Sequence, residues 1–275
     1  MSSRLDPTQA IEESAATGEV ADTFAEIRET MNIPWVTSIW RGLAGVPGGL
    51  STTWRAVRPL MDSDEINALL HELKTNIEFP IPAPLTVAER TAAGVTATDG
   101  TTIINIVDAY NRSNCLNLIA ITSLLRGPGG ESLAVSPQAK PPEWPTLPRL
   151  IPPSEISADH WALLQRTTTI AAAVINDNIP TLWRHLLDWP GLIEVIVDRF
   201  NAPDLRPSLI TAVQHTTDWV ETHAPRVSHL ANHTISIPET AREMLTRYVG
   251  PQPSVARMCT VGSSAAKWLR VSDWS

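Results

Sequence analysis

A single pattern of residues occurs twice in this chain. Residues 40–48 read Trp-Arg-Gly-Leu-Ala-Gly-Val-Pro-Gly, and residues 183–191 read Trp-Arg-His-Leu-Leu-Asp-Trp-Pro-Gly. Trp, Arg, Leu, Pro and Gly recur at the same offsets, and Asn-Ile-Pro precedes each copy, at 32–34 and 178–180. Two copies are too few for a solenoid, whose repeats stack in series, so the pattern favours duplication followed by pairing. We therefore expect a pseudo-two-fold molecule with a site in the groove between the copies.

A proline-rich stretch separates the two copies. Residues 127–157 contain eight prolines and three glycines. Proline removes a backbone donor and fixes φ, so such a stretch is neither a helix nor a central strand. This predicts a first helical repeat at 1–126, a linker at 127–157 that runs over the outside, and a second helical repeat at 158–275.

The rest of the chain carries helical patterns. Val20, Phe24, Ile27 and Met31 are spaced as one apolar stripe of a helix, and Thr86-Val-Ala-Glu89 is a capping box. Regular two-residue alternation bounded by turns is absent, so the predicted fold class is all-α. The predicted helices include 35–43, 50–61, 64–74, 101–125, 160–175, 191–200, 207–222, 238–249 and 253–269. A break within 110–117 is left open for the helix at 101–125.

Composition narrows the class of protein. The chain has 275 residues, 43% apolar and 18% charged, which is enough to bury a sizeable core. A net charge of −8 argues against nucleic acid or an anionic membrane as partner. The N-terminus lacks an apolar signal segment, and no run is long and apolar enough to span a bilayer, so we expect a cytoplasmic protein.

Signatures for cofactors and metals are missing. There is no phosphate-binding glycine loop, no Gly-x-Ser-x-Gly elbow and no His-Glu-x-x-His. Cys115 and Cys259 form no CxxC pair and are expected to be buried thiols. His229 and His233 have a helical i, i+4 spacing, but their polar surroundings indicate a loop. We expect no metal and no cofactor, and a small molecule as the substrate.

Polar side chains interrupt the longest predicted helix. Tyr110-Asn-Arg-Ser-Asn-Cys-Leu-Asn117 places Asn111, Asn114 and Asn117 near one another on a helix. Buried carboxamides are costly without partners, so they either face solvent or cap a helix break, or at least one orients a substrate carboxylate or a water.

Tryptophan and arginine cluster around the two copies of the pattern. The chain has ten Trp, and Trp35, Trp40, Trp183 and Trp189 flank the copies. They either pack in the core or line a pocket for a small apolar substrate or a cationic transition state. Arg41 and Arg184, at the same offset, are expected to tie helix ends or bridge the halves, with carboxylate binding as the alternative.

Two carboxylates are candidates for acid–base chemistry in the second half. Asp177 lies just before the Asn-Ile-Pro bend, and Asp188 precedes Trp189-Pro190. Each is either a helix cap or a solvent-facing group. The alternative is a general base beside a Trp, since burial raises the pKa of a carboxyl group towards neutrality and so lets it take up a proton.

Several segments resemble one enzyme family. The segments 26–36, 40–48, 108–117 and 182–190 are similar to those of the group I 2-haloacid dehalogenase (DehI) family, and the likeness spans most of residues 20–270. The resemblance implies an all-α, internally duplicated chain, distantly similar to AhpD-like proteins, with its site between the repeats. Members are often dimeric, so a homodimer is one option. It also implies that a carboxylate, helped by an Asn, activates a water that displaces halide from a 2-haloacid of either configuration without a covalent ester.

The resemblance assigns roles to individual residues. Asn114 matches the assisting Asn, and Asn117 stands where an aromatic is expected one turn later. The family's Asp aligns with Leu182, preceded by Thr181, so Asp177 or Asp188 would have to supply the base, and Asp177 is ranked first. The predicted substrate-binding residues are Trp35, Trp40, Tyr110, Asn117, Thr181, Leu182 and Trp183.

Two other functions stay open at this point. One is a lyase, isomerase or cyclase that acts on an apolar substrate in a Trp-lined pocket. The other is a binding protein that kept the pocket and lost the chemistry. A buried carboxylate facing Asn114 would favour an enzyme, whereas a lining of Trp, Leu and Asn alone would favour the alternatives.

Overall fold

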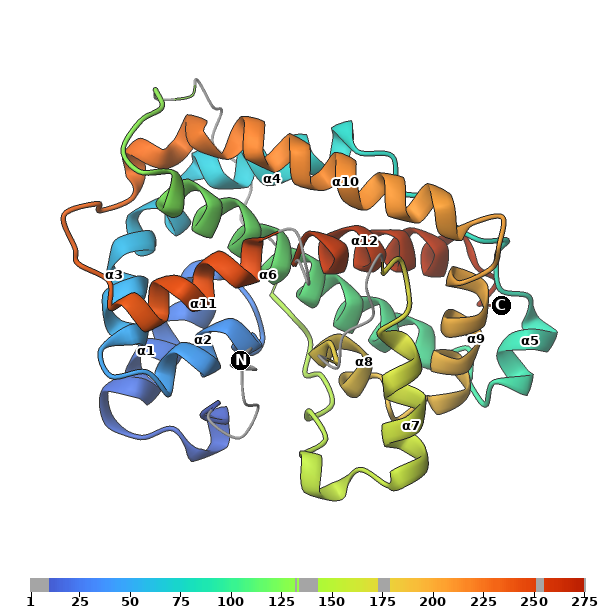
Figure 1. Cartoon of the computed structure of the whole chain (residues 1–275). Coiled ribbons are helices and arrows are strands. Elements are labelled where there is room, and N and C mark those ends of the chain that lie inside the picture. Colours follow the sequence, from blue (N-terminus) through green and yellow to red (C-terminus); the bar gives the residue numbers. More distant parts are fainter. Residues whose placement is uncertain (1–9, 132, 134–142, 173–178, 251–254, 275) are drawn as a thin grey trace, which may run out of the picture. The chain divides into compact units, whose positions relative to one another are not determined.

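The computed structural model describes residues 10–131, 133, 143–172, 179–250 and 255–274, and these residues form helices and connecting segments without a strand (Figure 1). The all-α prediction is therefore confirmed. The helices are η2 (Glu13–Ala15), α1 (Gly18–Met31), α2 (Ser38–Ala44), α3 (Gly49–Met61), α4 (Asp64–Asn76), α5 (Val87–Ala92), α6 (Asp99–Arg126), η3 (Pro153–Glu155), α7 (Ala158–Thr167), α8 (Thr181–His185), α9 (Pro190–Phe200), α10 (Arg206–His223), η4 (Ala224–Leu230), α11 (Glu239–Val249) and α12 (Val255–Val271).

The chain divides into two compact units, each made of three separate stretches. The first comprises Met1–Asn76, Arg112–Glu143 and Thr217–Val255, and the second comprises Ile77–Asn111, Trp144–Thr216 and Ala256–Ser275. This grouping describes contacts and not internal duplication, so the repeat boundaries at 126 and 158 stay a prediction. Among the described residues of 127–157, the short η3 is the sole helical turn.

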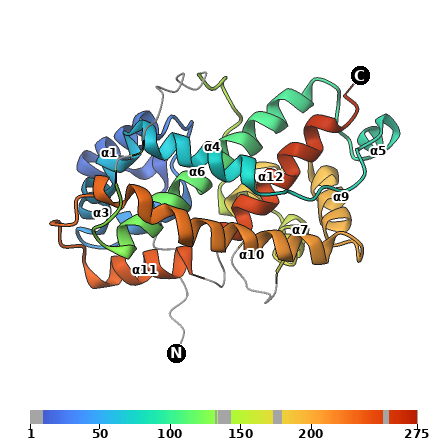
Figure 2. The same ribbon diagram turned by 90° about the horizontal axis from the view of Figure 1, so that it is seen from above.

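The first unit is built around α3. This helix packs against α1, α2, α4, α11 and η4, and α11 also contacts α2 (Figures 1 and 2). Trp40 of α2 and Trp54 of α3 are fully buried and meet edge to face, with ring centroids 5.6 Å apart. At Gly42 of α2, an added Cβ would lie 3.1 Å from the methyl group of Met244 in α11, so the Met244 side chain would have to shift by a few tenths of an ångström to admit it.

The second unit packs α7 against α8 and α9. Phe200 of α9 and Trp268 of α12 are fully buried and lie edge to face with centroids 5.8 Å apart. The Trp268 indole N–H donates to the Ala83 carbonyl at 2.8 Å, so α12 also holds the segment that leads into α5.

The predicted capping box opens α5 as expected. The Thr86 hydroxyl accepts from the Glu89 N–H at 3.3 Å, and the Glu89 carboxylate accepts from the Thr86 N–H at 2.9 Å. The hydrogen bonds from the Thr86 backbone and side chain, together with Arg199, lower the pKa of Glu89 to about 2.

The repeated Pro-Gly starts a helix in both copies, but the glycines serve different purposes. Gly48 precedes α3 with φ +68°, a left-handed conformation that glycine adopts without strain. Gly191 lies in the first turn of α9, where an added Cβ would stand 2.4 Å from the Ala93 carbonyl oxygen. One position needs glycine for its backbone and the other for close packing.

The break left open in the longest helix does not occur. α6 runs without interruption over 28 residues, and Figure 1 shows it as one continuous helix. Asn111, Asn114 and Asn117 are all buried within it, so they neither face solvent nor cap a break.

Candidate active site

Three predicted site residues share one face of α6. Tyr110, Asn114 and Asn117 follow one another at intervals of four and three residues, which keeps them within one stripe of the helix. The stripe from the first to the last is about 10 Å long at the rise of an α-helix. Asn114 retains 9% of its surface, and Asn117 retains none. The helix therefore presents a row of buried polar groups rather than an apolar seam.

Asn117 connects α6 to the segment that carries the first copy of the repeated pattern. Its side-chain oxygen accepts from the Trp40 indole N–H at 3.0 Å, and its amide N–H donates to the Thr37 hydroxyl at 3.0 Å. Asn117 thus forms hydrogen bonds with both a core indole and the side chain of Thr37, which stands at the N-cap position of α2. Since Trp40 and Asn117 are fully buried, their part in substrate binding stays a prediction.

Arg41, next to Trp40, has a structural partner. Its guanidinium pairs with Glu12, and its carbonyl accepts from the Ile11 N–H at 3.1 Å. This side chain is almost fully buried and ties the segment before α1 to α2. Trp35, in the bend before α2, is half-buried and keeps surface that a ligand could contact.

Tyr110, at the other end of the stripe, meets a histidine of α8. The Tyr110 hydroxyl lies 3.2 Å from Nδ1 of His185, and the rings are edge to face with centroids 5.8 Å apart. Nε2 of His185 lies 2.7 Å from the Pro148 carbonyl oxygen. Both rings are buried.

The environment of His185 favours its neutral form. Burial lowers the pKa of His185 below its ordinary value, with a smaller contribution from the Arg184 charge, while the Pro148 carbonyl and the Asp188 charge oppose the shift. The imidazole is therefore uncharged at neutral pH.

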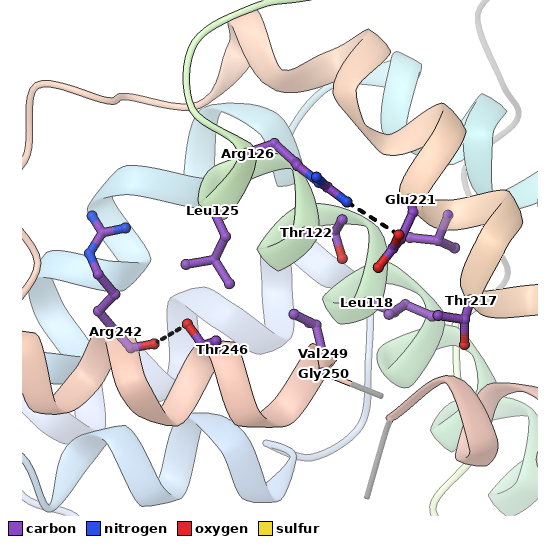
Figure 3. Close-up of a pocket in the computed structure, with 11 residues that line it drawn as sticks. Leu118, Thr122, Leu125, Arg126, Thr217, Glu221, Arg242, Thr246, Val249 and Gly250 are labelled. Atoms are coloured by element: carbon purple, nitrogen blue, oxygen red, sulfur yellow. Dashed lines mark hydrogen bonds and ion pairs between the residues drawn. The ribbon is translucent and has the colours of Figure 1, made fainter. Parts of the chain in front are cut away.

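A pocket of about 340 Å³ lies within the first unit, beside the C-terminal half of α6. Its lining is mostly apolar and threonine-rich, and Figure 3 shows Arg126 of α6 reaching toward Glu221 of α10, with N and O atoms 3.3 Å apart. The α6 residues in the lining begin one turn after Asn114. The pocket is lined by Leu118, Thr122, Leu125, Arg126, Thr217, Val220, Glu221, Arg242, Thr246, Val249 and Gly250. None of the predicted site residues is among them.

Comparisons with known proteins show which proteins this chain is similar to. No protein-family model matches the chain. A configuration-inverting 2-haloacid dehalogenase from Alcaligenes xylosoxydans xylosoxydans is 26% identical over 201 residues, which cover 69% of this chain and 67% of that protein. The chain is similar in sequence to the 2-haloacid dehalogenases.

Solved structures of D-2-haloacid dehalogenases have the same fold as this chain. A D-2-haloacid dehalogenase in complex with L-LA aligns with a TM-score of 0.67 at 14% identity, covering 94% of this chain and 93% of that one. A mutant D-2-haloacid dehalogenase with D-2-CPA aligns with a TM-score of 0.62 at 15% identity, covering 94% and 92%. The all-helical architecture is thus that of the dehalogenases.

In this chain, the position that the family resemblance gives to the catalytic Asp is buried in the core. Leu182 and its neighbour Trp183 in α8 are almost fully buried, while Thr181 at the start of the helix is half-buried. Asp188 is exposed, so the structure gives it no desolvated environment. Asp177 lies outside the described residues, and its role as the base stays a prediction.

His185, which contacts Tyr110, is not among the site residues predicted from the sequence. The two copies of the repeated pattern differ at its offset, where the first copy has Gly42. A histidine in one copy at the position of a glycine in the other is the feature of the sequence that could have drawn attention to His185. Among the described residues no group of three or more His, Cys, Asp or Glu could hold a metal ion, and Cys115 and Cys259 are buried free thiols. Within that same part of the chain, no helix is both long and apolar enough to cross a membrane.

Proposed function

We propose that this chain is a cofactor-free hydrolase that releases halide from a 2-haloacid and inverts the configuration at the α-carbon. The observation that carries the proposal is the match to a configuration-inverting 2-haloacid dehalogenase over 69% of the chain. The buried polar stripe on α6 supports it, because Asn114 is the residue that corresponds to the family's assisting Asn.

The proposed reaction is a direct displacement by water. The water oxygen forms a bond to the α-carbon as the carbon–halogen bond breaks, the halide leaves with the bonding electrons, and one water proton passes to a base. Asn114 orients the water, and Asp177 is the first-ranked base. The products are a 2-hydroxy acid of inverted configuration, halide and a proton.

Burial divides the proposed substrate-binding residues into two groups. Trp35 and Thr181 are half-buried and are proposed to touch the substrate. The remainder are buried and are proposed to shape the site from behind; they are Trp40, Tyr110, Asn117, Leu182 and Trp183.

The test is halide release from each enantiomer of 2-chloropropionate, with the configuration of the product determined by chiral chromatography. A single turnover in oxygen-18-labelled water with enzyme in excess should place the label in the product, since no enzyme ester intervenes. A wild-type protein that binds 2-haloacids without releasing halide would be a binding protein and would overturn the proposal.

We further propose that the enzyme is a cytoplasmic homodimer. Two buried free cysteines suit a reducing compartment, and the family resemblance supports the dimer. Light scattering after gel filtration would measure the mass, and fractionation of cells would locate the protein.

A further inference from the structure

The pocket beside the C-terminal half of α6 is formed within one compact unit. Its lining comes from α6, α10 and α11, and every lining residue belongs to the first unit. Leu118, Thr122 and Val220 are almost fully buried there, whereas Leu125 and Val249 keep part of their surface. The volume of about 340 Å³ lies in the range of about 300–1,000 Å³ that is usual for small-molecule sites. No residue proposed for halide release lines it, so the proposed dehalogenase reaction leaves this pocket unexplained.

The two ends of the pocket differ in their chemistry. Figure 3 shows the side chains of Arg126 and Arg242 on either side of Leu125, and Leu118 with Val249 away from both. The cations therefore gather where α6 ends and α11 begins, and the opposite end is apolar. A ligand that fits both ends has an apolar body and one polar head group.

The hydroxyl of Thr122 lies in the pocket without a hydrogen-bond partner. The residue is 7% exposed, and among the residues that the structure describes none donates to this hydroxyl or accepts from it. Thr246, also in the lining, differs because its hydroxyl donates to the Arg242 carbonyl at 2.9 Å. A buried hydroxyl is costly to leave unpaired. The Thr122 hydroxyl is thus a donor that can serve the head group of a ligand.

The two arginines leave donors and charge available for an anion. Arg126 pairs with Glu221 of α10 through one nitrogen at 3.3 Å, and both side chains are more than half exposed. A guanidinium has five N–H donors, so this contact leaves others for a second acceptor. Arg242 has no acidic partner within the described part of the chain. Two cations and one anion sum to +1 here, in a chain whose net charge is −8, so an anion is attracted to this end of the pocket and not to the protein as a whole.

We propose that the pocket binds a monoanionic amphiphile, namely a carboxylic acid with an unbranched apolar chain. The carboxylate accepts one hydrogen bond from the Thr122 hydroxyl and another from Arg126, which lies one helical turn later on the same face of α6. Arg242 of α11 adds a second positive charge, and the apolar chain packs against Leu118 and Val249. This site does not depend on the proposed dehalogenase reaction.

Isothermal titration calorimetry of the full chain with octanoate tests the head-group contacts. Thr122→Val keeps the shape of the side chain and removes the hydroxyl, and Arg126→Gln removes the charge from an exposed side chain. We expect each substitution to raise Kd about tenfold, the scale of one lost hydrogen bond to a charged group. Thr222→Val in α10 and Arg247→Gln in α11 lie outside the lining and are the matched controls, which should keep the wild-type Kd.

The charges lead to two further predictions of opposite sign. Glu221→Gln removes a like charge near the carboxylate and leaves the Arg126 donors, so Kd should fall about threefold. Arg242→Gln removes an attractive charge, so Kd should rise about threefold, and this difference should vanish in about 1 M salt. Octan-1-ol has the same chain without the charge, so its affinity should be weaker than that of octanoate and equal in wild type and Arg242→Gln.

The apolar end of the pocket is tested by the length of the ligand and by NMR. Each CH₂ removed from octanoate should weaken binding about fourfold, because less apolar surface leaves water. In methyl-labelled protein, the carbon-13 signals of Leu118 and Val249 should move when octanoate is added. The signals of Leu164 in α7, in the second unit, should stay in place.

Several results would overturn the proposal. An unchanged Kd in both Thr122→Val and Arg126→Gln would do so, as would weaker binding in Glu221→Gln or octan-1-ol that binds as tightly as octanoate. Wild-type protein that does not bind octanoate, or Leu118 and Val249 signals that stay in place on binding, would do so as well. Circular dichroism checks that each variant is folded, and Arg126→Gln decides the outcome if Thr122→Val loses helix, because the Arg126 side chain is exposed.

Discussion

The Trp40 indole donates to the side-chain oxygen of Asn117 across 77 positions of sequence. Both groups are fully buried, and the Asn117 amide donates one N–H to the Thr37 hydroxyl. The repeated pattern and the polar stripe of α6 are thus joined by one carboxamide. This explains why a carboxamide is stable in the middle of a 28-residue helix.

Removing this carboxamide should destabilise the first unit. Asn117→Leu leaves the Trp40 indole N–H and the Thr37 hydroxyl buried without their partner, and each such group costs about 1–3 kcal/mol. Urea unfolding of the variant should show a loss of about 2–6 kcal/mol, the sum for the two groups. Asn76→Ala, at the exposed end of α4, is the matched control and should change the free energy of unfolding by less than about 0.5 kcal/mol. Equal stability of Asn117→Leu and wild type would contradict the contact.

Local sequence patterns predicted where the helices lie better than they predicted which residues the helices contact. The apolar stripe from Val20 predicted a helix that ends at Met31, and α1 ends there, starting two residues earlier at Gly18. The break near Asn117 was expected because a buried amide without hydrogen-bond partners is too costly for a continuous helix. The partners of Asn117 are Trp40 and Thr37, which are distant in sequence, so the local pattern could not show them.

The candidate site was predictable only in part. The role predicted for Asn114 comes from the family resemblance, and the helix period places Tyr110 on the same face of α6. The pairing of Tyr110 with His185 spans 75 positions and depends on how α6 and α8 pack, which no local pattern encodes. The predicted indole-lined pocket is not visible at Trp40 or Trp183, whose side chains are fully buried.

Asn114 should matter for turnover and not for folding. Asn114→Ala removes the group proposed to orient the water, and halide release should fall about a hundredfold, the scale for losing one preorganised hydrogen bond in a site. Asn105→Ala is the control, because Asn105 lies on the opposite face of the same helix. The two variants should unfold at similar urea concentrations. A hundredfold loss in the control, or none in Asn114→Ala, would remove Asn114 from the site.

His185 should make the fold sensitive to acid. Its folded pKa is lowered, mainly by burial, so between that value and the ordinary one near 6.5 the unfolded chain binds more protons than the folded one. The contribution of this group is fully present above the unfolded pKa, and it diminishes as pH falls below it. The free energy of unfolding in urea should therefore drop from about pH 7.5 to about pH 5.5, and drop less in His185→Asn.

His71→Asn, on the exposed side of α4, is the matched control and should retain the wild-type pH dependence. An identical pH dependence in wild type and His185→Asn would show that the buried ring does not set the acid sensitivity.

Asp177 is the last test of the proposed chemistry. Water attack needs a group that accepts a proton within hydrogen-bond reach, and Leu182, at the position of the family's Asp, cannot accept one. Asp177→Asn keeps the shape of the side chain and removes the base, so halide release should fall about a hundredfold or more. Asp188→Asn is the matched control, because it makes the same carboxylate-to-amide change at an exposed residue. It should leave turnover within about twofold of wild type, like other surface substitutions. If Asp188→Asn carries the loss instead, the ranking of the two carboxylates is reversed. If neither variant loses activity in a protein that releases halide, a carboxylate base from this part of the chain is excluded.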